Sequence, residues 1–306
     1  MKISIVSPVY KAHLILPELI ERLIKTLDSI GESYEIILID DGCPWNSWAV
    51  IQQSCKENSN IKGIKLSRNF GQHHAITAGL DYCSGNWIVV MDCDLQDQPE
   101  EIVNLYNTAI TGYDIVYARR KNRTDGIFKK TTSYLFNKFF NYLSGLKQDS
   151  SIANFGIYSN KVITEVNKLR EPMRGFSPMV NWVGFKSTCI DVIHGTRFEG
   201  HSSYNWSRLI NLALDIAIAY SDKPLRITVK IGLLLSAFSM FFAIYNIINY
   251  FQGNIQQPGY ASLIFSIWFL GGLIIFILGI MGLYLSKTFE SVKGRSLYII
   301  DTKLNF

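Results

Sequence analysis

The first 120 residues alternate between two hydrophobic patterns. Short apolar runs rich in strand-favouring residues recur, and longer segments with apolar positions at helical spacing lie between them. The pattern predicts strands at Ile3–Ser7, Glu35–Asp40, Ile61–Ser67, Trp87–Asp92 and Asp114–Tyr117. It predicts helices at Leu16–Ile30, Ser47–Lys56, His73–Tyr82 and Pro99–Ile110. This order indicates an α/β fold, with a mostly parallel sheet and helices on both of its faces.

The carboxyl-terminal part of the chain shows a different pattern. No Asp, Glu, Lys, Arg or His occurs from Ile231 to Ser286. Within this window, Ile231–Phe251 and Ala261–Leu285 each exceed the ~20 residues that cross a bilayer as a helix, and Gln252–Gly259 is a polar turn between them. A pair of helices buried in a soluble core is the alternative, but so long an uncharged stretch favours a transmembrane hairpin.

Positive charges lie on both sides of this hairpin, and the turn between the helices has none. The basic residues are Lys223, Arg226 and Lys230 before the hairpin, and Lys287, Lys293 and Arg295 after it. By the positive-inside rule, we expect both ends of the hairpin and the large amino-terminal part of the chain to lie in the cytoplasm.

We therefore expect four regions: an α/β domain over residues 1–200, a juxtamembrane amphipathic segment over 201–226, the transmembrane hairpin over 227–286 and a cytoplasmic tail over 287–306. Two segments have the composition of interfacial helices. Ile127–Leu146 mixes lysines with aromatic residues, which is typical of a helix on a membrane surface and equally of an ordinary amphipathic helix on the sheet. Trp206–Tyr220 leads directly towards the first membrane span.

Composition restricts the partners of the chain. A net charge of +5, without a dense basic stripe and interleaved aromatics, favours an anionic membrane surface or a phosphate-bearing substrate over nucleic acid. The five cysteines form no Cys-x-x-Cys pair, so they fit a reducing compartment and predict no zinc site. Neither Gly-x-Gly-x-x-Gly nor a Walker A motif is present.

Acidic residues follow the predicted strand Trp87–Asp92. The polar side chains at its carboxyl end are Asp92, Asp94, Gln96 and Asp97. Oxygen ligands at this close spacing are typical of Mg²⁺ or Mn²⁺ sites, and the substrate group that such an ion binds is usually a diphosphate. A solvated acidic turn is the alternative, because Asp-x-Asp is common by chance. Parallel sheets bind ligands at the carboxyl ends of their strands, where Ser7–Tyr10 and Asp40–Gly42 also lie. For Asp40–Gly42, a simple turn is the alternative.

Taken together, these residues resemble glycosyltransferase family 2, which has the GT-A (Rossmann-like) fold. The matching motifs are Ser7-Pro8-Val9-Tyr10, Ile39-Asp40-Asp41-Gly42, Ser67-Arg68-Asn69-Phe70-Gly71, Asp92-x-Asp94-Leu95-Gln96-Asp97, Arg174-Gly175-Phe176, Asn181–Phe185 and Arg197–Tyr204. More narrowly, the chain resembles polyisoprenyl-phosphate glycosyltransferases, relatives of dolichyl-phosphate mannose synthase and of bactoprenol glycosyltransferases with two carboxyl-terminal transmembrane helices. The resemblance covers essentially the whole chain.

The resemblance implies an enzyme of cell-envelope polysaccharide synthesis. It would transfer a sugar, with inversion and metal dependence, from a nucleotide-diphosphate sugar (expected to be a UDP-sugar) to a polyprenyl phosphate such as undecaprenyl phosphate. The protein would be integral to the bacterial inner (plasma) membrane, with both termini and the catalytic domain cytoplasmic, and a homotetramer is expected. The alternatives are a non-catalytic membrane scaffold that binds nucleotide-sugar or lipid phosphate, and a family 2 transferase with another acceptor.

The resemblance also implies roles for individual residues. Asp94, Gln96 and Asp92 would hold Mg²⁺ or Mn²⁺ against the diphosphate. The expected catalytic residues are Asp92, Asp94 and Asn154, and the expected donor-binding residues are Pro8, Tyr10, Asp40, Arg68 and Asp92. The expected acceptor-phosphate residues are Arg119, Arg123, Arg197 and Ser203. Guanidinium forks suit phosphate oxygens, although a solvated surface charge is the alternative for each arginine.

Five positions depart from the pattern of this family. Lys11-Ala12 stands where relatives often have Asn-Glu, Cys43 replaces a serine, Asn154 replaces an aspartate proposed as catalytic base, and Ser203 replaces a lysine. The loss at position 154 need not abolish transfer. A phosphate monoester with a second pKa near ~6 is already largely ionised at cytoplasmic pH, so it needs positioning and charge screening more than deprotonation.

Overall fold

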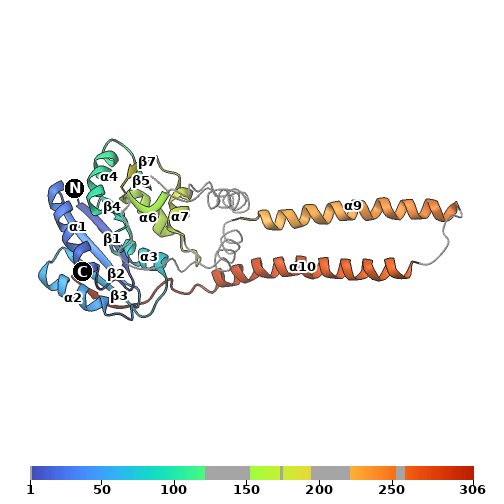
Figure 1. The fold of residues 1–306 in the computed structure, drawn as a ribbon, viewed down its shortest axis with the longest axis horizontal. Helices are drawn as coiled ribbons and strands as arrows, with labels where there is room; N and C mark the ends of the chain where they lie inside the picture. Colours follow the sequence, from blue (N-terminus) through green and yellow to red (C-terminus); the bar gives the residue numbers. More distant parts are fainter. Residues whose placement is uncertain (1, 121–151, 173–174, 194–220, 253–258) are drawn as a thin grey trace. The chain divides into compact units, whose positions relative to one another are not determined.

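The computed structural model describes residues 2–120, 152–172, 175–193, 221–252 and 259–306 (Figure 1). The chain divides into two compact units. The first contains residues 1–130, 148–203 and 295–306, and the second contains residues 131–147 and 204–294. The predicted interfacial helices Ile127–Leu146 and Trp206–Tyr220 both lie outside the described residues. So do three acceptor candidates: Arg123, Arg197 and Ser203.

The first unit is built on an eight-stranded sheet with strand order β7-β5-β6-β4-β1-β2-β3-β8. The strands are β1 (Lys2–Val9), β2 (Ser33–Asp40), β3 (Ile61–Leu66), β4 (Trp87–Val90), β5 (Ile115–Arg120), β6 (Ile152–Ser159), β7 (Ser187–Val192) and β8 (Ile300–Leu304). The pairs β1–β2, β1–β4, β2–β3 and β5–β7 are parallel, whereas β3–β8, β4–β6 and β5–β6 are antiparallel. The predicted mostly parallel α/β sheet is confirmed.

Helices cover both faces of this sheet (Figure 1). One face carries α1 (Leu16–Ile30), α2 (Ser47–Glu57), the 3₁₀ turn η1 (Pro99–Glu101) and α4 (Ile102–Ala109). The other face carries α3 (Gln72–Tyr82), α6 (Asn160–Lys168) and α7 (Phe176–Val183). Each face buries its own apolar cluster, because alternate residues of the central strands point to opposite sides.

Helix α1 illustrates how the sequence pattern specifies the packing. Its buried positions include Leu16, Leu19, Leu23 and Leu27, which share one side of a 3.6-residue helix. Each fully buried leucine contributes roughly 1.5–3 kcal/mol of hydrophobic stabilisation. Gly31 ends the helix at φ 77°, a left-handed conformation that glycine adopts without a Cβ penalty.

The four helices and five strands predicted for the first 120 residues are confirmed, with small shifts at their ends. The clearest shift is that β4 ends at Val90, before Asp92. Met91 still donates its N–H to Val6 O, and the chain then leaves the sheet, so Asp92 belongs to a loop. This places the acidic cluster beyond the edge of the sheet.

Strands β6 and β7 were not predicted from the sequence, and neither was β8. Strand β8 pairs antiparallel with β3, so the last residues of the chain complete the sheet of the first unit. Asn305, which follows β8, donates from Nδ2 to Cys55 O at 2.7 Å and to Ile61 O at 2.8 Å. The expected tail, residues 287–306, therefore contains the end of a long helix, a connecting segment and an edge strand.

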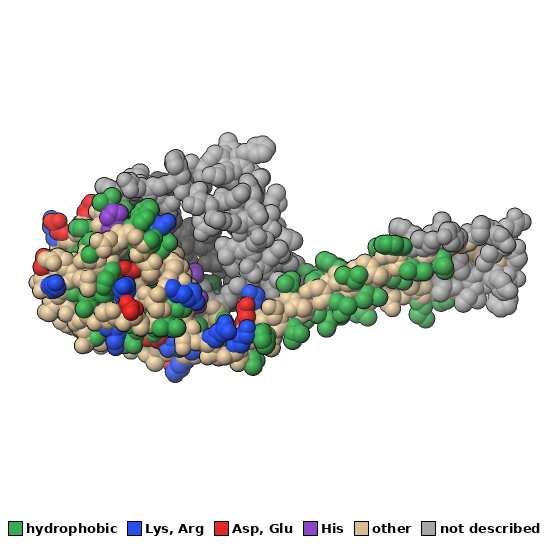
Figure 2. All heavy atoms as spheres, turned by 90° about the horizontal axis from the view of Figure 1, so that it is seen from below, with side chains coloured by type: hydrophobic (Ala, Val, Ile, Leu, Met, Phe, Trp, Pro, Cys, Tyr) green, Lys and Arg blue, Asp and Glu red, His purple; other side chains and the backbone are tan. Residues whose placement is uncertain are grey.

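The second unit contains two long helices, α9 (Lys223–Phe251) and α10 (Tyr260–Val292). Both are long and apolar enough to cross a membrane, and their most apolar windows, Leu225–Phe242 and Ser266–Val292, are 6% and 0% buried. Figure 2 shows hydrophobic side chains spread over the described helical surface. The predicted helices of the hairpin are confirmed, and the alternative of two buried core helices does not fit these exposed windows.

Candidate functional site

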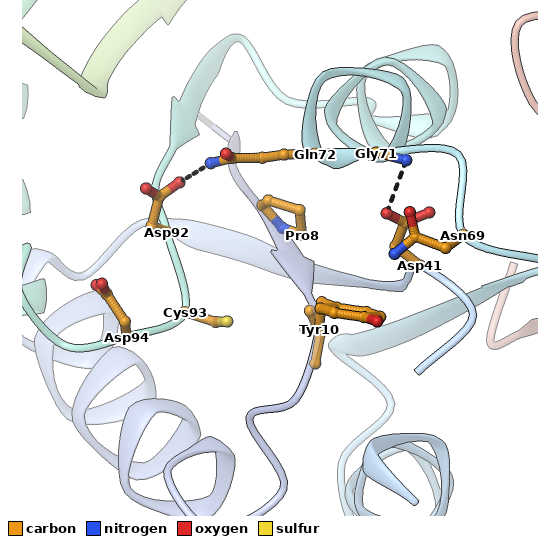
Figure 3. A pocket seen from close by; sticks show the side chains of 10 residues that line it. Pro8, Tyr10, Asp41, Asn69, Gly71, Gln72, Asp92, Cys93 and Asp94 are labelled. Atoms are coloured by element: carbon orange, nitrogen blue, oxygen red, sulfur yellow. Dashed lines mark hydrogen bonds between the residues drawn. The ribbon is translucent and has the colours of Figure 1, made fainter. Parts of the chain in front are cut away.

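A pocket of about 280 Å³ lies in the first unit, at the carboxyl ends of β1, β2 and β4 (Figure 3). Its walls are Pro8, Val9, Tyr10, Asp41, Asn69, Gly71, Gln72, Asp92, Cys93 and Asp94. These residues come from the end of β1, from the loops that follow β1, β2 and β4, from the loop before α3 and from the first residue of α3. The crevice at the carboxyl ends of parallel strands is where an open α/β sheet is expected to bind its ligand.

Two carboxylates, Asp92 and Asp94, form the acidic side of this pocket. The turn after Asp94 is held in two ways. Gln96 N–H donates to Asp94 Oδ1 at 3.1 Å, and Leu95 adopts φ 57° with its side chain buried in the core. A left-handed backbone conformation at a leucine costs roughly 1–2 kcal/mol. Burial of the Leu95 side chain in the core offsets this strain and so stabilises the turn.

Gln72 joins the amino end of α3 to the acidic side of the pocket. Its Nε2 donates to Asp92 Oδ1 at 2.6 Å (Figure 3). The amide therefore fixes the position of one oxygen of the Asp92 carboxylate. Sequence reasoning missed Gln72, because nothing in the local pattern links a residue at a helix start to a carboxylate after the next strand.

Asp41 stabilises the opposite side of the pocket by accepting two backbone hydrogen bonds. Its Oδ1 accepts from Phe70 N–H at 2.7 Å and its Oδ2 from Gly71 N–H at 2.9 Å. Gly42 permits this approach, since a Cβ there would lie 2.5 Å from Arg68 C and Asn69 N. Sequence reasoning included Asp41 in the Asp40–Gly42 cluster but expected donor binding from Asp40 alone.

Asp40 itself is buried behind the pocket wall and does not line it. Its Oδ1 accepts from Cys43 N–H at 2.7 Å, and its Oδ2 has no hydrogen-bond partner among the described residues. Burial raises the pKa of this carboxyl above its ordinary value, against the opposing effect of the Cys43 N–H.

Arg68 also lies outside the pocket lining. Its guanidinium donates to Asn69 O at 3.0 Å and lies 4.0 Å from the ring centroid of Phe70. Of the five donor-binding candidates, the structure thus brings Pro8, Tyr10 and Asp92 together in the pocket and leaves Asp40 and Arg68 beside it.

The remaining candidates have other surroundings. Asn154 Oδ1 accepts from Ser177 Oγ at 3.2 Å, and the residue does not line the pocket. Gln96 lies in the turn after Asp94 but is not among the lining residues. Arg119 Nε donates to Asp191 Oδ1 at 2.5 Å, so its guanidinium has an intramolecular carboxylate partner.

The residues of the pocket fit a divalent ion that also binds substrate. Among the described residues, no group of three or more His, Cys, Asp or Glu side chains is arranged to hold a metal by itself. Asp92 and Asp94 nevertheless face one pocket. Mg²⁺ is usually held by one or two carboxylates together with substrate phosphates, and this pocket offers two carboxylates.

Comparison with known proteins gives a consistent family match. The model of glycosyl transferase family 2 matches residues 4–165. An uncharacterised glycosyltransferase of Synechocystis is 35% identical over 302 residues, which is 98% of this chain and 95% of that protein. Undecaprenyl-phosphate 4-deoxy-4-formamido-L-arabinose transferase of Proteus mirabilis is 32% identical, over 98% and 93%. Bactoprenol glucosyl transferase of Shigella phage SfII is 32% identical, over 98% and 97%.

Solved structures support the fold. Glucosyl-3-phosphoglycerate synthase of Mycobacterium tuberculosis, in complex with Mn²⁺, UDP-glucose and phosphoglyceric acid, matches with a TM-score of 0.50 and 16% identity. The match covers 71% of this chain and 78% of that one. The similarity shows that the two proteins share the architecture of the sheet and its covering helices.

Proposed function

Since the chain belongs to glycosyltransferase family 2 and its relatives include polyprenyl-phosphate transferases, we propose that it transfers a sugar from a UDP-sugar to undecaprenyl phosphate at the cytoplasmic face of the membrane. The observation that carries the proposal is the pocket in which Asp92 and Asp94 lie opposite Tyr10 and Asp41. Relatives that match over nearly the whole chain support a lipid-phosphate acceptor, because the match includes the two apolar helices.

The donor would bind with its diphosphate against Asp92 and Asp94. A bound Mg²⁺ or Mn²⁺ would supply neutralisation of the negative charge on the departing nucleoside diphosphate. Asp92 and Asp94 would hold this ion, with Gln96 as a further candidate ligand. Gln72 orients Asp92 through the 2.6 Å hydrogen bond, and Asp41 keeps the facing loop in position through Phe70 and Gly71.

The acceptor phosphate would attack the anomeric carbon of the sugar. One bond forms between a phosphate oxygen and this carbon, and the bond from the carbon to the diphosphate breaks, so the electron pair leaves with the nucleoside diphosphate. Attack from the side opposite the leaving group inverts the configuration. A phosphate dianion needs no proton acceptor, so transfer does not require a carboxylate at position 154.

Helices α9 and α10 would form the transmembrane hairpin, with the flanking lysines and arginines on the cytoplasmic side of the bacterial inner membrane. The catalytic domain would span residues 1–200, and the acceptor phosphate would meet Arg119, Arg123, Arg197 or Ser203. Of these, only Arg119 lies in the described part of the chain, where it pairs with Asp191. Phosphate binding by Arg119 would therefore compete with this ion pair.

A donor screen tests the proposal. Full-length protein in detergent would be mixed with undecaprenyl phosphate and, one at a time, radiolabelled UDP-sugars and GDP-sugars, with Mn²⁺ or Mg²⁺. We expect label in the lipid fraction for one UDP-sugar, and loss of that label with EDTA. A scaffold would bind nucleotide-sugar without transferring label. Absence of labelled lipid with every donor would contradict the proposal, and transfer that persists in EDTA would contradict its metal dependence.

A further inference from the structure

A lysine lies between two exposed aromatic rings beside the pocket. Lys11 Nζ is 5.4 Å from the ring centroid of Tyr10 and 4.9 Å from that of Trp45. Tyr10 is 43% exposed and Trp45 is 51% exposed, and Tyr10 also lines the pocket. Within the described ranges, no carboxylate forms an ion pair with this ammonium group. Its three N–H donors are thus held near the pocket by ring contacts and remain available to a ligand.

The backbone around Lys11 is fixed in an uncommon conformation. Lys11 has φ 56°, the left-handed region that a residue with a long side chain adopts only at a cost. Its N–H donates to Cys43 Sγ at 3.1 Å, and Trp45 N–H donates to the same sulfur at 3.3 Å. The Cys43 thiol therefore connects the loop after β1 to the loop after β2, and so keeps Lys11 and Trp45 next to each other.

The pocket has two chemically different sides (Figure 3). Asp92 and Asp94 lie on one side, and Tyr10, Asp41 and Asn69 lie on the other. If the diphosphate of the donor binds at Asp92 and Asp94, as the proposed function requires, the nucleoside extends towards Tyr10. A base at that end would meet exposed aromatic rings, and base–aromatic stacking typically contributes about 1–3 kcal/mol whatever the base. The rings therefore supply affinity, and selectivity must come from a polar group.

We propose that Lys11 is a specificity-determining residue for the base of the nucleotide donor. Its ammonium group donates a hydrogen bond to a carbonyl oxygen on the edge of the base, at the position where cytosine and adenine carry an amino group. An amino group there presents N–H to a group that can only donate, so both would lose a partner. Uracil carries O4 and cytosine an N4 amino group at the same ring position. The inference rests on the proposed function, because it assumes that the donor is a nucleoside diphosphate derivative.

Nucleotide binding tests this inference. Dissociation constants of the full chain in detergent with Mn²⁺ would be measured calorimetrically for two pairs of nucleotides, UDP with CDP and IDP with ADP. In each pair the first base carries an oxo group where the second carries an amino group. We expect the wild-type protein to favour the oxo member of each pair by about 10-fold or more. Lys11→Met, which keeps an apolar side chain of similar length without N–H donors, should bring both ratios close to one.

The matched control is Lys56→Met, since Lys56 is exposed on α2 and should leave both ratios unchanged. Thermal unfolding checks that Lys11→Met is folded. If it is not, Lys11→Gly replaces it, because glycine has no side-chain donor and adopts the left-handed backbone without strain. Unchanged ratios in a folded Lys11 variant would overturn this inference and leave the proposed function intact. Failure of the wild-type protein to bind any of the four nucleotides would overturn both.

Discussion

The side chain of Gln72 donates a hydrogen bond to Asp92 Oδ1 over 2.6 Å. Gln72 is the first residue of α3, and Asp92 lies two residues beyond the end of β4. The bond therefore fixes a pocket carboxylate to a helix that packs on the sheet. Hydrogen bonds to charged groups contribute about 1.5–3 kcal/mol, which is enough to select one orientation of the carboxylate.

We predict that Gln72→Ala lowers kcat/KM for sugar transfer by about 10-fold, because partners that orient a ligand carboxylate typically affect activity by 10–100-fold. The variant should remain folded, with at most a small drop in the unfolding temperature, since Gln72 is exposed. Initial rates of lipid labelling measure the effect. The matched control is Gln53→Ala, which removes an exposed glutamine of α2 that bonds to Glu57. Equal rates for Gln72→Ala and the wild-type protein would show that Asp92 needs no such orientation.

We predict that Asp94→Ala abolishes transfer, with a loss of at least about 10²-fold, while the protein stays folded. The alanine also removes the acceptor for Gln96 N–H, so Asp94→Asn is the informative companion. Asparagine can keep that turn bond but lacks the negative charge, and we expect the same loss of activity. Circular dichroism and the labelling assay decide the matter. Normal turnover by either folded variant would reject Asp94 as a metal ligand.

We predict a milder effect, less than about 10-fold, for Asn154→Ala. The reason is that an ionised acceptor phosphate needs positioning rather than a base, and a general base typically contributes 10²–10⁴-fold. Ser177→Ala serves as the control, because it removes the hydroxyl that donates to Asn154 Oδ1 and leaves the amide in place. A loss for Asn154→Ala as large as that for Asp94→Ala would show that the amide takes a direct part in the chemistry.

The hydrophobic pattern predicted β1 to β5, because the central strands β1, β2 and β4 are buried on both faces and appear as continuous apolar runs bounded by polar turns. It did not predict β6, β7 or β8. Strand β8 shows why, since Ile300–Leu304 alternates weakly and is stabilised by β3, more than 200 residues earlier in the chain. Gln72 and the role of Asp41 were missed for a related reason. Their partners, Asp92 and the Phe70–Gly71 amides, are 20 to 30 residues away, and local spacing does not encode such contacts.

Glu35 makes the stability of the sheet depend on pH. This buried carboxylate accepts from Ser4 Oγ and Ser84 N–H, and it forms ion pairs with Lys2 at 2.9 Å and Lys62 at 2.8 Å. Burial alone would raise its pKa, but these partners together lower the pKa from 4.5 to about 2. Because the pKa is lower in the folded than in the unfolded protein, the carboxylate stabilises the fold above pH 4.5, and this contribution is lost as the pH falls towards 2.

We therefore predict that Glu35→Gln lowers the free energy of unfolding by roughly 3 kcal/mol at neutral pH, from 1.36 kcal/mol per pKa unit. The difference between the variant and the wild-type protein should shrink as the pH falls below about 4. Urea denaturation of both proteins at several pH values provides the measurement. A difference that does not vary with pH would mean that shape, and not charge, determines the contribution of Glu35.

Asn305 fastens the end of the chain to the sheet. Its Nδ2 donates to Cys55 O and Ile61 O, and its backbone is left-handed at φ 63°. We predict that Asn305→Ala destabilises the first unit by about 1–3 kcal/mol, since it removes two hydrogen bonds and places a Cβ-bearing residue without polar compensation in a left-handed conformation. Asn305→Gly loses the same bonds without that backbone cost, so it should be less destabilising. Hydrogen exchange of the β3 and β8 amides, followed by mass spectrometry, reports the change, and equal protection in all three proteins would show that β8 is held by its strand pairing alone.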